Sequence, residues 1–480
     1  MPSKKSLNST NLEALGAQRL AELLIEVSTG NATVKRRLRL ELASAQNPGE
    51  VAKEVRKRLT AIERSRAFVD WQNRKTLIED LDAQCRAIVN QVANTDSTEA
   101  LELMWRFMAL PNSIFERCDD SSGTVISIFH AACRNLAEIV QVAKVTPEVL
   151  AERAFNALIE NDYGQYDELI GVLSPVLGPT GLELLKERFL ELSKAPPERP
   201  KDKDRKVIGW GTSGPLYADE ITGHRRESTV RLALQEIADA QGDVDAFIAQ
   251  QSEKARTVPR VASEIARRLL EAGRVKEAWS AIDAIEENRP GWIPIEWEET
   301  RLDVMEALGR KDEAQGFRWE CFEQSLNSAH LRAYLKRLPD FEDFEAEERA
   351  MLFVRRFPSV HQALAFLVSW PALEKAEALI IERSDELNGD HYEILSPAAD
   401  ALAAKHPLAA TLLLRAMIEF ALKENRVKRY RHAARHLAEC ASLAAAIGDF
   451  GQFEPHKHYS SRLKAEYRRK DSFWRLTLIS

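Results

Sequence analysis

The same glycine-centred step occurs twice in this chain, 36 residues apart. The two copies are Gly273, Arg274, Glu277 and Ala278, and Gly309, Arg310, Glu313 and Ala314. Glycine accepts the left-handed backbone that ends a helix, and an alanine five residues later lets the next helix pack closely. An earlier turn at Gly242 gives spacings of 31 and 36 residues, which bracket the period of about 34 residues in tetratricopeptide repeats. The sequence therefore predicts helical hairpin repeats and a tetratricopeptide-like superhelix in the C-terminal half.

Apolar residues recur at intervals of three and four almost throughout the chain, as in the run Leu12, Leu15, Leu20, Leu23, Leu24 and Val27. Strict alternation over the length of a strand is hard to find, and Pro48, Pro147 and Pro407 stand where helices are expected to start. The predicted class is all-α.

The length of 480 residues exceeds what a single core usually supports, so two domains or a repeat array are expected. The clearest interruption of the apolar pattern lies between Lys194 and Arg226, where prolines, lysines and glycines follow one another. We therefore expect an N-terminal helical domain over residues 1–195, a linker or long loop over 196–226, and a tetratricopeptide-like helical repeat domain over 227–480.

The composition is that of a globular protein, with 45% hydrophobic and 29% charged residues. We find no apolar run of the 18 or more residues that a membrane helix needs, and Lys4 and Lys5 precede no apolar segment of a secretory signal. The five cysteines are scattered and form no Cys-x-x-Cys pair, which favours buried thiols in a reducing compartment. These features predict a cytoplasmic protein that does not bind membranes.

The net charge of -7 conceals a strong segregation of charge along the chain. Residues 1–75 carry a net +7, residues 405–480 carry a net +8, and the middle carries -22. Either the basic ends dock on the acidic middle, or they are free to bind an anionic partner, or the charged helix faces are simply solvated.

Three stretches of the chain resemble an uncharacterised family of bacterial helical proteins of unknown function. They are Phe68-Val69-Asp70-Trp71 with Asp80-Leu81-Asp82, Tyr217-Ala218-Asp219-Glu220-Ile221, and Tyr430-Arg431-His432-Ala433-Ala434-Arg435-His436-Leu437 continuing to Phe473-Trp474. Similar segments occur in proteins with a SWIM zinc finger, although this chain lacks the Cys-x-Cys and Cys-x-His ligands of that finger. The resemblance implies a helical-repeat fold and supplies no activity.

One pattern suits a metal ion, because His432, His436 and Cys440 share one helix face. At a rise of about 1.5 Å per residue, His432 and Cys440 stand about 12 Å apart, so a single ion would need His436 with one neighbour. His456 or His458 would then close the site. The candidate metal ligands are His436, Cys440, His456 and His458, and the competing interpretation is an ordinary packed helix.

Two further patterns are rejected on their context. Residues Gly209 to Gly214 match the G-x-G-x-x-G pattern of nucleotide-binding loops, but Pro215 follows where a helix should open. Asp119-Asp120 lacks the spacing of a calcium loop and is better explained by the N-terminus of the next helix, with Ser121 or Ser122 as its cap.

The densest basic segments are Lys35 to Arg39, Lys53 to Arg58, and Lys423 to Arg435. Arginines near Tyr430 would suit a nucleic acid, with Lys428, Arg429, Arg431 and Arg435 as the candidate contacts. The isoelectric point of 5.9 is far from that of a dedicated nucleic-acid binder.

We find no catalytic signature, and we assign no catalytic residue and no cofactor. The predicted function is a non-enzymatic scaffold that binds a protein or peptide in a helical-repeat groove. The alternatives are nucleic-acid binding through the basic ends and an unrecognised hydrolase or metal-dependent enzyme. Trp297 and Trp319 belong either to the core or to the groove, because the sequence does not give the rotation of their helices.

Overall fold

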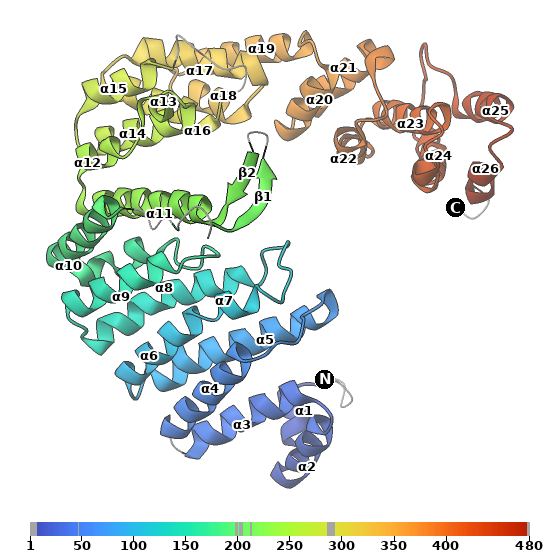
Figure 1. Ribbon diagram of the computed structural model, residues 1–480. Coiled ribbons are helices and arrows are strands. Elements are labelled where there is room, and N and C mark those ends of the chain that lie inside the picture. Colours follow the sequence, from blue (N-terminus) through green and yellow to red (C-terminus); the bar gives the residue numbers. More distant parts are fainter. Residues whose placement is uncertain are drawn as a thin grey trace. The chain divides into compact units, whose positions relative to one another are not determined.

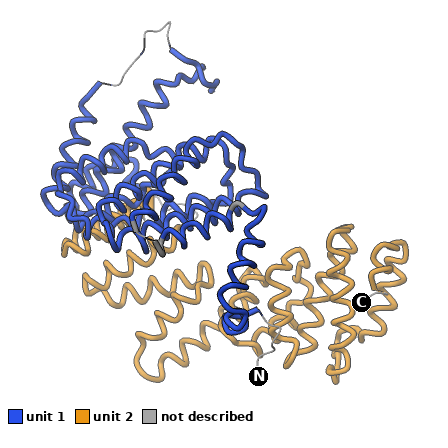
Figure 2. Tube along the Cα trace, turned by 90° about the horizontal axis from the view of Figure 1, so that it is seen from below, with its two compact units in different colours: residues 1–257 blue, residues 258–480 orange. Residues whose placement is uncertain are grey.

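The computed structural model describes residues 7–46, 48–196, 200, 205–211, 214–285 and 293–477. Within these ranges most residues are helical, and the chain divides into two compact units, Met1–Thr257 and Val258–Ser480 (Figures 1 and 2). The all-α class predicted from the spacing of apolar residues is confirmed.

The first unit contains the helices α1 to α13 and a short hairpin. Its elements are α1 (Ser9–Glu13), α2 (Ala17–Ser28), α3 (Ala32–Gln46), α4 (Pro48–Glu63), α5 (Trp71–Ala87), the π-helical turn η1 (Ile88–Val92), α6 (Ser97–Met108), α7 (Pro111–Ile114), α8 (Ile126–Ala143), α9 (Pro147–Ile159), α10 (Leu169–Lys194), β1 (Val207–Gly211), β2 (Gly214–Tyr217), α11 (Ala218–Gln241), α12 (Val244–Ala249) and α13 (Glu253–Arg256). One continuous apolar core runs from Leu40 on α3 to Ile237 on α11.

The second unit contains α14 to α26. Its elements are α14 (Pro259–Glu271), α15 (Val275–Asp283), α16 (Ile295–Ala307), α17 (Lys311–Ser325), α18 (Ser328–Leu335), α19 (Glu342–Arg355), α20 (Val360–Ser369), α21 (Leu373–Glu382), the 3₁₀ turn η4 (Ser384–Glu386), α22 (Tyr392–Leu402), α23 (Pro407–Lys423), the 3₁₀ turn η5 (Val427–Arg429), α24 (Tyr430–Ala444), α25 (His456–Glu466) and α26 (Asp471–Thr477). From α14 to α24, each helix contacts the next one along the chain, and several also contact the one after that. Its larger apolar core runs from Phe322 to Phe473.

The turns between helices repeat one hydrogen-bonding pattern. Gly242, Gly273 and Gly309 have φ angles of 67°, 73° and 75°, the left-handed conformation that favours glycine. After Gly273, the amide of Arg274 donates to Leu269 O at 2.8 Å, the long-range bond that closes a helix end with a left-handed residue. The same bond joins Arg310 to Met305 O at 3.0 Å. The predicted glycine turns are confirmed.

Ala278 and Ala314 are fully buried, as the repeat pattern predicts. Ala278 lies on α15, which packs against α14 and α16, and Ala314 lies on α17, which packs against α16 and α18. The single methyl group of alanine fits where helices pack closely. The spacing from glycine to alanine in the sequence therefore predicted a helix–helix contact correctly. The tetratricopeptide-like superhelix itself stays a prediction.

The segment predicted as a linker, 196–226, contains regular structure. Strands β1 and β2 pair in an antiparallel hairpin, in which Gly211 lies opposite Gly214, and α11 begins at Ala218. Helix α11 packs against α9 and α10, and its residues Val230 and Leu234 join the core of the first unit. The compact units therefore divide after Thr257, further along the chain than the boundary expected from the sequence.

Among the described residues, α10 is the one helix that is long and apolar enough to match a membrane span by composition. It contains Pro175 and Pro179, and Gly178 between them has non-helical backbone angles. Helices α8, α9 and α11 all pack against it, and the side chains of Leu173, Leu177 and Leu185 are fully buried. Its apolar composition is thus accounted for by its place in the core.

Candidate anion-binding pockets

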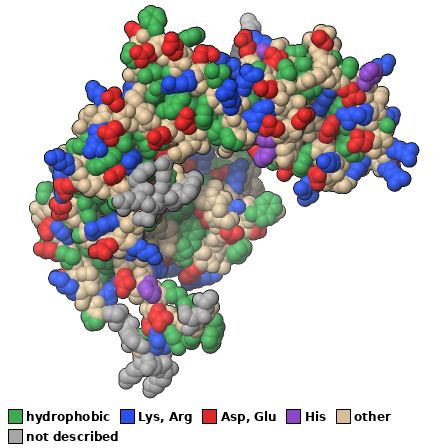
Figure 3. All heavy atoms as spheres, turned by 90° about the horizontal axis from the view of Figure 1, so that it is seen from above, with side chains coloured by type: hydrophobic (Ala, Val, Ile, Leu, Met, Phe, Trp, Pro, Cys, Tyr) green, Lys and Arg blue, Asp and Glu red, His purple; other side chains and the backbone are tan. Residues whose placement is uncertain are grey.

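The third basic segment of the sequence forms one wall of a pocket in the second unit, which we call the C-terminal pocket. It has a volume of about 260 Å³ and lies among α22, α23, η5 and α24. Its lining residues are Gly389, Tyr392, Ser396, Met417, Ala421, Lys428, Arg429, His432, Ala433, Arg435 and His436. Three of them are lysine or arginine and none is a carboxylate, so the side chains that line the pocket carry a net positive charge. Figure 3 shows basic side chains interspersed with acidic ones on this end of the second unit, at the right of the view.

Local backbone structure brings the charged side chains to the pocket. Helix α23 ends at Lys423, and Asn425, whose φ of 53° is left-handed, then reverses the chain into the turn η5. Lys428 and Arg429 lie on that turn, and α24 starts immediately after it. His432, Arg435 and His436 follow at helical spacings of three and four, which place them on one face of α24.

The opposite wall depends on a close approach of two backbones. Gly389 precedes α22, and a Cβ atom at this position would lie 2.1 Å from the carbonyl oxygen of Ala416 on α23. Any side chain would therefore push the loop away from α23. Because Gly389 has no side chain, Tyr392 at the start of α22 can lie beside η5.

The three cations of the pocket differ in how firmly they are held. Arg429 is 2.8 Å from Asp390, and its guanidinium lies over the rings of Tyr392 and Phe420 at 4.7 and 5.5 Å. Arg435 is exposed and lies 3.4 Å from Glu439. Lys428 is exposed and has no ionic partner among the described residues. The pocket therefore combines one positioned guanidinium with two cations that a ligand can reach.

The four predicted nucleic-acid contacts do not all share this pocket. Lys428, Arg429 and Arg435 line it. Arg431 is exposed on α24, one turn before Arg435, but it is not among the lining residues.

The predicted metal ligands take up different environments. His436 is buried and its Nδ1 lies 3.0 Å from Glu439 Oε2. Cys440 is fully buried, its Sγ donates to Thr411 O, and burial raises the pKa of its thiol to about 12. Burial, aided by Arg415, lowers the pKa of His456. His458 is exposed.

Among the described residues, these four do not form a group of three donor atoms within 4.8 Å of one another. The one group that meets this criterion is Glu298, Cys321 and His330.

The other two basic segments converge on a second pocket, which we call the N-terminal pocket. It lies among α3, α4 and α5 in the first unit and has a volume of about 280 Å³. Its lining residues are Lys35, Arg36, Arg39, Leu40, Glu54, Lys57, Arg58, Ala61 and Gln84. Because α3 packs against α4, two basic segments that are separate in the sequence form one cationic surface.

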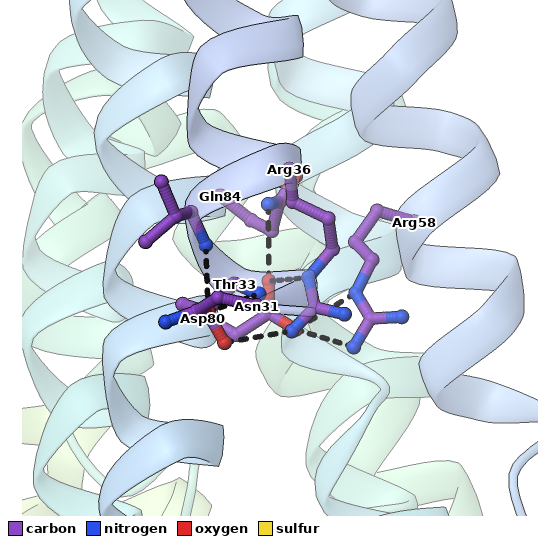
Figure 4. A network of polar contacts seen from close by, with 7 residues as sticks. Asn31, Thr33, Arg36, Arg58, Asp80 and Gln84 are labelled. Atoms are coloured by element: carbon purple, nitrogen blue, oxygen red, sulfur yellow. Dashed lines mark hydrogen bonds and ion pairs between the residues drawn. The ribbon is translucent and has the colours of Figure 1, made fainter. Parts of the chain in front are cut away.

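A buried carboxylate organises this second pocket (Figure 4). Asp80 on α5 is only 4% exposed, and it accepts a hydrogen bond from Arg58 Nε at 2.7 Å and a second bond from Arg58 Nη2. Arg36 Nε lies 3.6 Å from the other oxygen, which also accepts a bond from Gln84 Nε2 at 3.4 Å. Asp80 thus holds two guanidinium groups from two helices against the pocket.

The charges of the N-terminal pocket do not cancel. Lys57 lies 3.7 Å from Glu54, whereas Lys35 and Arg39 have no ionic partner among the described residues. Five cationic side chains therefore face one carboxylate on the lining and one behind it. A small anion would find donors already oriented there.

Sequence reasoning found the basic segments but missed the residues that orient them. Asp80 and Asp390 each hold an arginine in place, and the sequence does not indicate that role. Asp80 was singled out only within a stretch that resembles the uncharacterised helical family. Tyr392 stands apart in the sequence from the segment it faces.

The acidic turn at Asp119-Asp120 is a helix cap, as predicted, but the capping residue differs. Asp120 accepts hydrogen bonds from the amides of Val125 at 3.0 Å and Ile126 at 2.9 Å, at the start of α8. A carboxylate satisfies two amides at once and interacts favourably with the helix dipole, which explains why it replaces Ser121 or Ser122 in that role.

Fold and pockets together define an all-α protein with cationic pockets formed by both of its basic ends. The chain matches the family of unknown function DUF6880 over residues 2–476, and it belongs to that family. No curated protein matches the chain. The resemblance to an uncharacterised helical family is thereby confirmed, and the similarity to segments of SWIM zinc finger proteins stays a prediction.

Proposed function

We propose that this protein is a non-enzymatic scaffold that binds an acidic segment of a partner protein, and that the C-terminal pocket is the docking site. The observation that carries the proposal is the lining of that pocket, which holds Lys428, Arg429 and Arg435 without a carboxylate. Tyr392 is exposed beside these cations and offers an apolar surface to the partner's side chains.

The arrangement of the pocket favours a peptide carboxylate. Arg429 is already fixed by Asp390 and by stacking on Tyr392, so a ligand loses less entropy in ordering it. Lys428 and Arg435 then provide charge at the rim, where it steers an acidic segment towards the pocket. A volume of about 260 Å³ suits one or two side chains of a bound peptide.

The whole chain argues against a long polyanion as the ligand. Its net charge is -7, and the residues between the basic ends carry -22. A long nucleic acid would be repelled by this net negative charge, whereas a short acidic peptide segment would interact mainly with the pocket.

A scaffold role is also consistent with the helical hairpins of the second unit. Helices that contact their neighbours in chain order, with the same hydrogen bond at successive turns, support the proposed tetratricopeptide-like superhelix. We place the protein in the cytoplasm, in line with five cysteines that are all buried.

Fluorescence anisotropy with two labelled peptides tests the proposal. One peptide alternates glutamate with tyrosine and glycine, and the other carries glutamine in place of each glutamate. We expect the acidic peptide alone to bind. Combined Lys428→Glu and Arg435→Glu substitutions are expected to weaken binding at least tenfold, which corresponds to about 1.4 kcal/mol.

Combined Lys423→Glu and Lys464→Glu substitutions are the matched control, because both lysines are exposed in the second unit and neither lines the pocket. They change the net charge as much as the pocket variant does and should leave peptide affinity within about twofold of the wild type. Equal losses in both variants would show that binding depends on net charge alone and would refute the pocket. Binding of a single-stranded oligonucleotide, with log affinity falling linearly with log salt and no binding of the acidic peptide, would instead establish the nucleic-acid alternative.

A further inference from the structure

Three consecutive helices of the second unit bring together a cysteine, a histidine and a glutamate. Glu298 lies on α16, Cys321 on α17 and His330 on α18. One donor atom of each lies within 4.8 Å of the other two, and His330 Nε2 is 2.9 Å from Glu298 Oε2. Cys321 is fully buried and His330 is 4% exposed. The group is independent of the pockets described above.

The backbone between these helices is built to hold the histidine close to the cysteine. Helix α17 ends at Leu326, a buried leucine with a φ of 53°, where glycine would ordinarily be expected. Asn327 then caps α18 by accepting a hydrogen bond from the amide of Ala329 at 2.8 Å. His330 therefore lies in the first turn of α18, one tight reversal after the last turns of α17 that carry Cys321. A strained residue in such a turn is typical of a position that the surrounding structure specifies.

The donor set is that of zinc. Thiolate, imidazole and carboxylate are the three ligand types that proteins use for Zn²⁺, at about 2.3, 2.0 and 2.1 Å respectively. In a tetrahedral site such bonds place donor atoms about 3.3–3.6 Å apart, within the 4.8 Å limit that the three donor atoms meet.

A nucleophilic role for Cys321 fits less well. A Cys–His–Glu arrangement is also found in thiol enzymes, but their cysteine must reach a substrate. Cys321 has no exposed surface, whereas the side chain of Glu298 is 14% exposed and gives an ion a route from solvent. A small cation can use that route and a peptide or ester cannot.

The cysteine distinguishes this group from other histidine–glutamate pairs in the chain. His436 and Glu439 are 3.0 Å apart, and His406 and Glu377 are 2.8 Å apart, without a third donor atom within reach among the described residues. Such pairs alone are ordinary hydrogen bonds. At Glu298 and His330 the pair lies beside a buried sulfur.

We propose that Glu298, Cys321 and His330 bind one zinc ion, with a water molecule as the fourth ligand. On binding, the Cys321 thiol loses its proton to solvent and the thiolate forms the S–Zn bond, while neutral His330 and ionised Glu298 donate lone pairs. The ion joins α16, α17 and α18, so it stabilises this part of the second unit.

The full-length protein provides the test. It is stripped with a chelator, dialysed against excess zinc and then against metal-free buffer, and zinc is counted by mass spectrometry. We expect one zinc per chain. Cobalt(II) in its place is expected to give thiolate-to-cobalt charge-transfer absorption and the intense visible bands of a tetrahedral site.

Two pairs of variants locate the site. Cys321→Ser and His330→Gln are expected to lose the cobalt charge-transfer band or at least tenfold in zinc affinity, measured by competition with a chromophoric chelator. Cys440→Ser and His436→Gln are the matched controls, since they alter another buried cysteine and another histidine–glutamate pair. They should keep wild-type stoichiometry and affinity.

The near-isosteric Glu298→Gln keeps the shape of the site if Cys321→Ser does not fold. It removes the carboxylate and should weaken zinc binding at least tenfold. Wild-type protein that retains no zinc and shows no charge-transfer band overturns the proposal. So does a loss of zinc in the Cys440 and His436 variants that equals the loss in the Cys321 and His330 variants.

Discussion

Gly389 offers the sharpest test of how the second unit packs. A Cβ atom at this position would lie 2.1 Å from Ala416 O and 2.7 Å from Met417 Cα, both backbone atoms of α23. Ordinary van der Waals contact begins near 3.4 Å, so Gly389→Ala must move the loop before α22 away from α23. Backbone atoms in a helix cannot yield as a flexible side chain does.

The expected cost follows from two opposing effects. Forcing an extra methyl group into a packed contact costs about 1–3 kcal/mol, and the clash here favours the upper part of that range. Replacing glycine by alanine also restricts the unfolded chain, which returns about 0.4–1 kcal/mol. We therefore expect Gly389→Ala to lower the free energy of unfolding of the second unit by about 1–2 kcal/mol.

Gly316→Ala is the matched control. Gly316 lies inside α17, and a Cβ atom there meets nothing within 4 Å. The substitution improves helix propensity and should stabilise the protein by about 0.5–1 kcal/mol. Guanidinium unfolding followed by circular dichroism should show the two midpoints moving in opposite directions. If Gly389→Ala raises the midpoint as Gly316→Ala does, the loop does not lie against α23 and the wall of the C-terminal pocket is wrongly described.

Three further predictions address other parts of the chain. Ala278→Asp places a carboxylate at a fully buried position and should lower the free energy of unfolding by about 3 kcal/mol or more. The control, Ala272→Asp at the exposed end of α14, should lower it by under about 1 kcal/mol. Equal shifts of the two variants in thermal melts would contradict the packing of α15. Limited trypsin digestion should cut first within 196–226, and initial cleavage elsewhere would argue against the linker expected from the sequence. Burial raises the pKa of Glu236 from 4.5 to about 7, and the nearby charges of Asp167 and Asp239 add to the shift. Protonated Glu236 therefore favours the folded state at low pH, and this contribution to stability is lost as the pH rises through about 7. Glu236→Gln should therefore stabilise the protein by about 1–3 kcal/mol near pH 8 and little near pH 4. If the urea midpoints of the variant and the wild type differ by the same amount across that pH range, the pKa of Glu236 is not raised.

The helical class and several contacts were predictable because they depend on short-range patterns. The step from Gly273 to Ala278 combines a helix end with a small residue at a fixed distance along the next helix, so it indicated both the turn and the burial of Ala278. The hairpin of β1 and β2 was missed. Its strands are short, and Gly209 interrupts the alternation at the irregular point of the pairing.

The candidate sites were predictable only in part. The basic segments at residues 35–39 and 53–58 were evident, but their convergence on one pocket depends on the packing of α3 against α4. The rotation of α16 makes Trp297 a core residue, 6.1 Å from the ring of Phe317. Trp319 is partly buried and lines a groove with Tyr334 and Arg349.

The sequence by itself determined the class of fold, the glycine turns and the location of charge along the chain. Each of these follows from neighbours within a few residues, because helix periodicity, capping and charge density are local properties. Only the tertiary structure decided which side chains meet. Asp80 and Arg58, or Glu298, Cys321 and His330, come from different helices, and their contact depends on how apolar faces pack the helices against one another. The packing of the helices brings these polar side chains together, and the sequence of a single segment does not determine that packing.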